Sequence, residues 1–185
     1  MKRAIEIMIS IIFVIIIFPL GLIVSLVIFI DVKDNPFHFS KRVGMNNKLF
    51  NMPKFRTMRQ DTPQVATDLL NEKKYITQSG KFLRKYSIDE LPQFLSVIKG
   101  DMSIIGPRPA LFNQSELIKK RNLKGIDKLK PGITGWAQIN GRDKISVDEK
   151  VKLDQYYLMN KSIILDLKII FLTIFNVVLK RNISH

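Results

Sequence analysis

The hydrophobic pattern of the chain begins with a long apolar run. Residues 7–30 contain no charged side chain, and a straight helix of that length would measure roughly 36 Å. The hydrocarbon core of a bilayer is only about 30 Å thick. The run exceeds the usual apolar stretch of a signal peptide and is not followed by a small-residue cleavage site. It therefore predicts a helix that stays in the membrane.

Pro19 interrupts this run near its centre. Proline removes a helical hydrogen bond and clashes with the preceding turn, so the run divides into two arms that each extend about 17 Å, close to half the hydrocarbon thickness. Lys2 and Arg3 precede the run and a basic segment follows it, which draws both ends to the cytoplasm. From the residues alone, a re-entrant helix and a mildly kinked transmembrane helix both remain open.

The chain becomes polar after this run, so we expect a membrane helix over residues 1–32 and a cytoplasmic interfacial domain over 33–185. Residues 37–43 and 48–58 alternate in polarity on either side of a short turn and predict a β-hairpin. Pro53 weakens the second of these strands.

The remaining segments are mostly helical in pattern. Residues 79–99 place apolar side chains at helical spacing, and we expect this helix to carry the site. Residues 111–130 mix basic and apolar residues, as do helices on membrane surfaces and solvated charged faces. Residues 131–142 contain three glycines and the lone tryptophan, which predicts an ordered loop. Residues 162–180 suit an interfacial or a core helix equally. Together, the segments predict a mostly helical α/β fold with interfacial amphipathic helices.

Composition narrows the chemistry. The 185 residues are 46% hydrophobic and 25% charged, as expected for one folded domain. With 30 Lys and Arg against 16 Asp and Glu, the net charge is +14, which attracts nucleic acid, phosphorylated ligands or acidic membranes. The absence of cysteine and the presence of only two histidines exclude disulfides, thiol nucleophiles and Cys/His zinc sites. Any chemistry must use carboxylates, Lys, Arg or a hard metal ion.

Two adjacent carboxylates, Asp89 and Glu90, lie at the start of a predicted helical segment. One interpretation is structural, because Ser87 and Glu90 have the spacing of a capping box and acidic residues complement the helix dipole. The other is chemical. Neighbours on a helix point about 100° apart, so one carboxylate could attack an electrophile while the other holds a cation.

Arg108 lies between Pro107 and Pro109. The two prolines restrict its backbone, and a guanidinium is a natural bidentate partner of phosphate. A surface ion pair is the alternative. Lys54 and Arg142 are further basic candidates, and this set has functional meaning only if it converges in space.

In their order along the chain, these blocks resemble the polyprenyl-phosphate phosphoglycosyl transferases, the bacterial sugar transferase family, in its small monotopic form. Within that family the resemblance is greatest to capsule-initiating members that use UDP-activated acetamido sugars. The blocks that carry it follow the proline-broken N-terminal run and comprise residues 54–58, 84–93, 100–103, 106–109 and 131–138.

The resemblance implies a two-step reaction. Asp89 would attack the sugar-linked phosphorus of a UDP-sugar, expel UMP and pass the sugar phosphate to undecaprenyl phosphate. Glu90 would ligate Mg²⁺, a hard cation that prefers oxygen ligands, and we expect Asp89 to stay ionised close to arginines and this ion. The resemblance also implies a set of cations that bind the substrate phosphates: Lys54, Arg84, Arg108 and Arg142.

The resemblance implies a place in the cell as well. The N-terminal helix would be re-entrant, broken at Pro19, and the protein would be monotopic on the cytoplasmic face of the bacterial inner membrane. The basic helix around Lys119 and the C-terminal segment would rest on the inner-leaflet headgroups. Downstream glycosyltransferases are candidate partners, and nucleic acid is not expected to bind. The non-enzymatic alternative is a membrane-tethered basic module that binds nucleic acid or anionic lipid.

Overall fold

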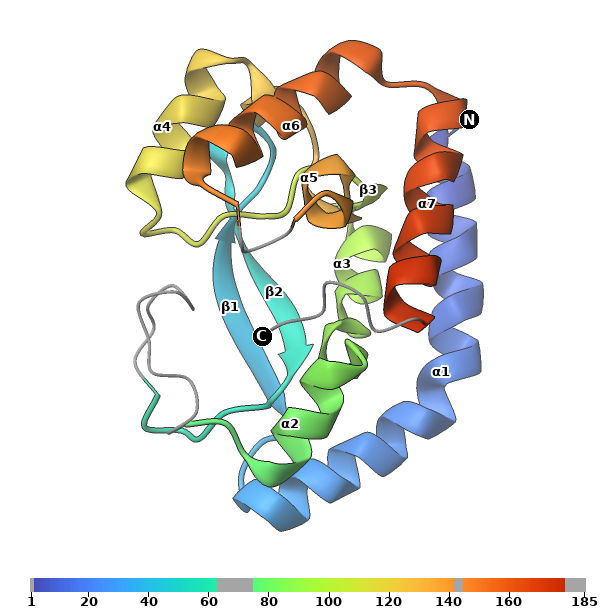
Figure 1. Ribbon diagram of the computed structural model, residues 1–185. Coiled ribbons are helices and arrows are strands. Elements are labelled where there is room, and N and C mark those ends of the chain that lie inside the picture. The colour runs from blue at the N-terminus through green and yellow to red at the C-terminus, as the bar shows by residue number, and fades with distance from the viewer. Residues whose placement is uncertain (1, 63–74, 142–144, 179–185) are drawn as a thin grey trace.

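The computed structural model describes residues 2–62, 75–141 and 145–178. Its first element is the helix α1 (Lys2–Val32), which contains Pro19 and bends partway along its length (Figure 1). Proline is the ordinary cause of such a bend. Most apolar side chains of α1 face outward, and Val24 and Ile28 are buried against the rest of the protein. Among the described helices, α1 is the one long and apolar enough to cross a bilayer, by length and composition.

Polar contacts fix the N-terminal end of α1 to the rest of the protein. Lys2 Nζ donates to Asp166 at 2.6 Å, and Arg3 donates to the Met102 carbonyl at 3.1 Å. Glu6, which is buried despite its place beside the apolar run, accepts a hydrogen bond from Ser103 Oγ at 2.5 Å. This end of the helix is therefore part of the folded domain.

The other end of α1 is fixed to the same domain. Asp31 accepts hydrogen bonds from the backbone N–H of Ser79 at 2.9 Å and from its hydroxyl at 2.6 Å. Just beyond the helix, Asp34 forms an ion pair with Arg56 at 3.3 Å. Both ends of the apolar helix are thus bonded to one folded body.

The predicted hairpin is confirmed. Strand β1 (Phe37–Val43) pairs antiparallel with β2 (Leu49–Phe55), and the short 3₁₀ turn Met45–Asn47 joins them. Pro53 lies inside β2 opposite Phe39. It is tolerated because both strands of a two-stranded sheet are edge strands, where a missing N–H need not break a ladder.

The single helix predicted over residues 79–99 is wrong. The segment forms α2 (Gln78–Lys85), a 3₁₀ turn η4 (Ile88–Glu90) and α3 (Gln93–Lys99). The break falls at Ser87, whose φ of 54° is left-handed and cannot continue a helix. The two carboxylates therefore lie in a turn between two helices.

The ordered loop predicted over residues 131–142 is also wrong over its described part. Strand β4 (Gly132–Thr134) pairs in parallel with β3 (Ser103–Ile105), and the one-turn helix α5 (Trp136–Ile139) follows directly. The glycines serve close backbone approach. A Cβ added to Gly132 would lie 2.1 Å from the backbone nitrogen of Gly106.

This approach makes Gly132→Ala a destabilising substitution. We expect a loss of about 3 kcal/mol or more in the free energy of unfolding, because backbone on both sides cannot yield to the added methyl group. Gly21→Ala is the matched control, since its Cβ would meet only Phe55 at an ordinary 3.7 Å. Thermal unfolding in detergent measures both. Equal melting temperatures for the two variants would contradict the packing argument.

The C-terminal half adds α4 (Ser115–Leu123), a 3₁₀ turn η5 (Ile126–Lys128), α6 (Val147–Asn160) and α7 (Ile163–Val178). Residues 111–130 do not form one continuous basic amphipathic helix, because the chain turns at Gly125 with φ 69°. Lys119 is exposed, but Figure 1 places α4 on the opposite side of the molecule from α1. The arrangement therefore gives no support to a membrane surface shared by α4 and α1.

Helix α7 combines both interpretations of the C-terminal segment. Ile169 is fully buried against Tyr157 and Ile105, whereas Ile164 and Phe171 are strongly exposed. Figure 1 shows α7 alongside the N-terminal part of α1, where Lys2 and Asp166 join them. The outward apolar side chains of α7 thus extend the apolar surface of α1.

Candidate active site

The two carboxylates of the 3₁₀ turn η4 are buried. Asp89 is 4% exposed and Glu90 9% exposed. The left-handed Ser87 precedes them and Pro92 follows, so the backbone is constrained on both sides of the turn. Ser87 makes no side-chain capping hydrogen bond. The capping-box interpretation is therefore wrong, and burial of two acidic groups needs another explanation.

Glu90 is the centre of an ion-pair cluster. Its Oε1 accepts hydrogen bonds from Lys54 Nζ and from Arg108 Nη2, each at 2.9 Å. Lys54 comes from β2, and Arg108 follows β3. Residues far apart in the sequence therefore meet at this carboxylate, as the functional interpretation of the basic candidates required.

Asp89 is different from its neighbour. Its Oδ1 is buried and makes no hydrogen bond within the described residues. Leaving such an oxygen unpaired costs free energy, so unpaired buried groups are rare in folded proteins and are candidates for a functional role. The atom is a carboxylate oxygen held away from water and not committed to a structural partner.

The electrostatics of Asp89 reflect two opposing effects. Burial raises the pKa of its carboxyl above the ordinary 3.8, and the charge of Glu90 adds to this rise, while Lys54, Arg84 and Arg108 oppose it. Burial likewise lowers the pKa of Lys54, with Glu90 acting against that change. The sequence led us to expect a carboxylate kept ionised by its cationic neighbours. In the structure, the effect of burial on the pKa of Asp89 exceeds the opposing effect of the cations.

Arg84 approaches the cluster from α2. Its Nε donates to Thr57 Oγ1 at 3.0 Å, and its Nη2 lies 3.0 Å from Met58 Sδ. These contacts hold the guanidinium where its charge acts on Asp89. Sequence reasoning did not single out Thr57, although it belongs to the 54–58 block. Arg142, the remaining predicted phosphate ligand, lies outside the described residues.

Gln93 is a further residue that the sequence reasoning missed. It opens α3, four positions after Asp89, and is 1% exposed, with an amide nitrogen that has no hydrogen-bond partner within the described residues. A buried unpaired amide donor is as costly as an unpaired acceptor. The signal available in the sequence was that Gln93 follows closely after the two adjacent carboxylates.

The carboxylates fit a magnesium site that substrate helps to build. No group of three or more acidic, histidine or cysteine side chains lies close enough to hold a metal ion in the part of the chain that the structure describes. Mg²⁺ does not need such a group, because it is usually held by one or two carboxylates together with substrate phosphates and water. Glu90, the expected Mg²⁺ ligand, can supply one such carboxylate next to Asp89 in the same turn.

Known proteins share sequence similarity with nearly the whole of this chain. The model of the bacterial sugar transferase family matches residues 1–180. The uncharacterised sugar transferase EpsL of Bacillus subtilis is 44% identical over 144 residues, covering 78% of this chain and 70% of the relative. The exopolysaccharide production protein ExoY of Sinorhizobium fredii is 35% identical, covering 97% and 86%.

A third relative is longer than this chain. The UDP-glucose:undecaprenyl-phosphate glucose-1-phosphate transferase of Escherichia coli is 36% identical over 185 residues, covering 95% of this chain but 39% of the relative. The match thus spans nearly the whole of this sequence and less than half of that enzyme. By the extent of the family match, this chain belongs to the bacterial sugar transferase family.

Proposed function

We propose that this protein transfers a sugar 1-phosphate from a UDP-sugar to undecaprenyl phosphate and releases UMP, which would initiate a capsule or another surface glycan. Relatives named for this transfer, with glucose as the sugar, support the reaction class. The observation that carries the proposal is the buried Asp89, with an unpaired oxygen beside a carboxylate bound to two cations.

The chemistry follows from the two carboxylates having different partners. An Asp89 oxygen attacks the sugar-linked phosphorus, the bond from that phosphorus to the UMP oxygen breaks, and UMP leaves with the electron pair. A phosphate oxygen of undecaprenyl phosphate then attacks the same phosphorus and releases Asp89 as a carboxylate. Burial raises the pKa of Asp89, and the carboxylate attacks in its ionised form, which needs no general base. This suits an oxygen that has no hydrogen-bond partner within the described residues.

The cationic side chains of the site act by holding positive charge at fixed positions beside the substrate phosphates. Phosphoryl transfer relies mainly on positioning and on charge stabilisation. Lys54 and Arg108 are oriented by Glu90, and Arg84 by Thr57, so their charges are in place before substrate arrives. Arg142 remains a predicted member of this set. Mg²⁺, with Glu90 as its proposed ligand, would compensate the charge that develops on the phosphate oxygens.

We propose further that α1 is re-entrant and that the protein is monotopic on the cytoplasmic face. The support is that Lys2, Arg3 and Glu6 at one end of the helix and Asp31 at the other bond to the same folded domain. One small domain on one side of a bilayer cannot hold both ends of a straight spanning helix. Such a placement brings a soluble nucleotide sugar and a lipid-borne phosphate to one site.

Single-cysteine labelling tests this topology, because the native chain has no cysteine. In spheroplasts, Lys2→Cys and Asn35→Cys should both react with an impermeant maleimide only after the membrane is opened. Ile16→Cys is the control. Its side chain is 69% exposed from the protein, so only lipid would protect it from the reagent on both sides. Labelling of positions 2 and 35 from opposite sides would establish a spanning helix.

The identity of the sugar on the UDP-sugar substrate is a more specific question. The resemblance to capsule-initiating enzymes predicts a UDP-acetamido sugar, whereas relatives are named for glucose and for galactose. A panel of these UDP-sugars, scored by UMP release in the presence of undecaprenyl phosphate and Mg²⁺, tests the reaction and the sugar together. Salt-sensitive binding of DNA without turnover would favour the basic-module alternative instead. Phosphate release that needs no nucleotide sugar would indicate a phosphatase.

A further inference from the structure

The segment that carries Arg108 is held by its carbonyl groups. The carbonyls of residues 107–110 each accept a hydrogen bond from another part of the chain. The donors, in order, are Gly132 N at 2.9 Å, Arg121 Nη1 at 2.8 Å, Arg42 Nη1 at 3.1 Å and Val43 N at 3.0 Å. The segment is therefore fixed from several directions.

The peptide bond between Arg108 and Pro109 can be held by only one backbone group, the Arg108 carbonyl, which accepts from Arg121. Proline has no N–H, so the carbonyl of Arg108 is the only backbone group of that peptide plane that can form a hydrogen bond. Proline fixes its own φ and restricts the preceding residue to extended ψ values, so other contacts set the ψ of Arg108 only within that range. The donor to this carbonyl, Arg121, therefore fixes the peptide plane beside Arg108 within the range that Pro109 allows.

Arg121 is itself rigidly placed. It lies on α4 and is 8% exposed, and its Nε and Nη2 donate to Asp154 Oδ2 at 3.0 and 2.6 Å. Asp154 lies on α6 and is 2% exposed. Burial raises the pKa of the Asp154 carboxyl, and the Arg121 guanidinium opposes that rise. With Nη1 donating to the Arg108 carbonyl, each of the three nitrogens of the Arg121 guanidinium donates to a protein group.

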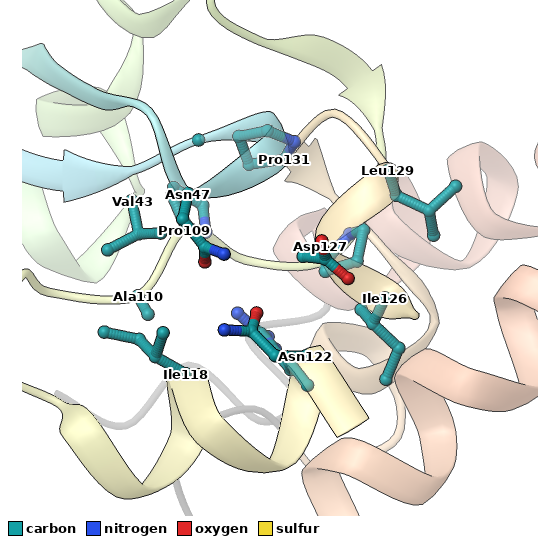
Figure 2. Close-up of a pocket in the computed structure, with 13 residues that line it drawn as sticks. Val43, Asn47, Pro109, Ala110, Ile118, Asn122, Ile126, Asp127, Leu129 and Pro131 are labelled. Carbon is teal, nitrogen blue, oxygen red and sulfur yellow. The ribbon is translucent and has the colours of Figure 1, made fainter. Parts of the chain in front are cut away.

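The space around Arg121 does not fit a substrate. Figure 2 shows the hollow that it lines, between the segment at Pro109 and the α4 residues Ile118 and Asn122. The hollow has a volume of about 30 Å³, whereas sites for small organic ligands occupy about 300 Å³ or more. Arg121 therefore acts on the site through protein atoms.

We propose that Arg121, held by Asp154, is a positioning residue that orients Arg108 towards Glu90 and the substrate phosphate. This inference rests on the proposed function, in which Arg108 binds phosphate. It extends the site to α4 and α6, two helices that contribute no group to the reacting atoms. A misplacement of the reacting or binding groups by about 1 Å can lower a rate about 100-fold, so such an effect is measurable.

Arg121→Lys tests the proposal, because lysine keeps the charge but cannot bond Asp154 twice and the Arg108 carbonyl once. We expect kcat/KM for the UDP-sugar to fall about 10- to 100-fold. The loss should appear in whichever constant, kcat or KM, Arg108→Ala changes. Asp154→Asn, which retains an acceptor for Arg121, should show a smaller loss of the same kind. Glu116→Gln, a substitution of an exposed side chain on the same helix α4, should match the wild type.

A double-mutant cycle separates positioning from general damage. In an Arg108→Ala background, Arg121→Lys should cause no further loss of kcat/KM, with activity normalised to the folded fraction from a thermal melt. The same fractional loss in both backgrounds would overturn the proposal, as would wild-type kinetics for folded Arg121→Lys and Asp154→Asn. Unchanged kinetics for Arg108→Ala alone would instead contradict the role of Arg108 in the proposed function.

Discussion

Asp89→Asn should abolish turnover without damaging the fold. UMP release should drop by more than about 10⁴-fold, as is typical when a covalent nucleophile is removed, because an amide cannot form the phosphosugar ester. The substitution is nearly isosteric, and Oδ1 makes no hydrogen bond in the described structure that would be lost. The expected result is an inactive protein that still folds.

The same variant should be as stable as the wild type or more stable. Burial raises the folded-state pKa of Asp89, so the folded state favours the protonated carboxyl. That contribution to stability is complete below the unfolded-state pKa near 3.8 and is lost as pH rises through the folded-state value. At neutral pH the charged group is therefore a cost that neutral asparagine removes. Melting temperatures at pH 7 measure the effect, and a marked decrease would show that Asp89 has a structural role.

Glu90→Gln should lower the stability of the protein, in contrast to Asp89→Asn. Glutamine keeps an acceptor for Lys54 and Arg108 but removes the negative charge that compensates both cations. We expect a loss of about 1–3 kcal/mol in the free energy of unfolding, since hydrogen bonds to charged groups are the stronger ones. Activity should fall about 100-fold or more, because the cations that stabilise the transferring phosphoryl group lose their anchor.

A surface carboxylate provides the control for Glu90. Glu116 forms an ion pair with Lys120 on α4, but its side chain is 66% exposed. Glu116→Gln should change stability by less than about 0.5 kcal/mol, because exposed ion pairs contribute little. Of the two neighbours in η4, Glu90→Gln should lower the melting temperature, whereas Asp89→Asn should leave it unchanged or raise it, and both should reduce turnover. A neutral effect of Glu90→Gln on stability would contradict the ion-pair cluster.

Local pattern was sufficient for several elements. The apolar run became α1, and the alternating segments on either side of a short turn became β1 and β2. Charge and motif order made convergence a condition for the basic candidates, and two of them, Lys54 and Arg108, meet at Glu90. Arg142, the third, lies outside the described residues. These features depend on information carried by neighbouring residues or by whole recognisable blocks.

Other features depend on contacts between distant segments, and pattern alone missed them. The break at Ser87 requires a left-handed residue inside a segment with helical periodicity. The strand at Gly132 exists because glycine allows its backbone to lie against Gly106. Burial of Arg121 inverts the expectation for a basic helix, because its partner Asp154 is 33 residues away.

The most direct test is to look for the covalent intermediate at Asp89. The protein is incubated with a UDP-sugar that it turns over and Mg²⁺, without undecaprenyl phosphate, then digested and mapped by mass spectrometry. We expect UMP release of up to one equivalent and a sugar phosphate ester on the peptide containing Asp89, which disappears when undecaprenyl phosphate is added. An adduct on another residue, or UMP release that requires the lipid and leaves no adduct, would contradict this expectation.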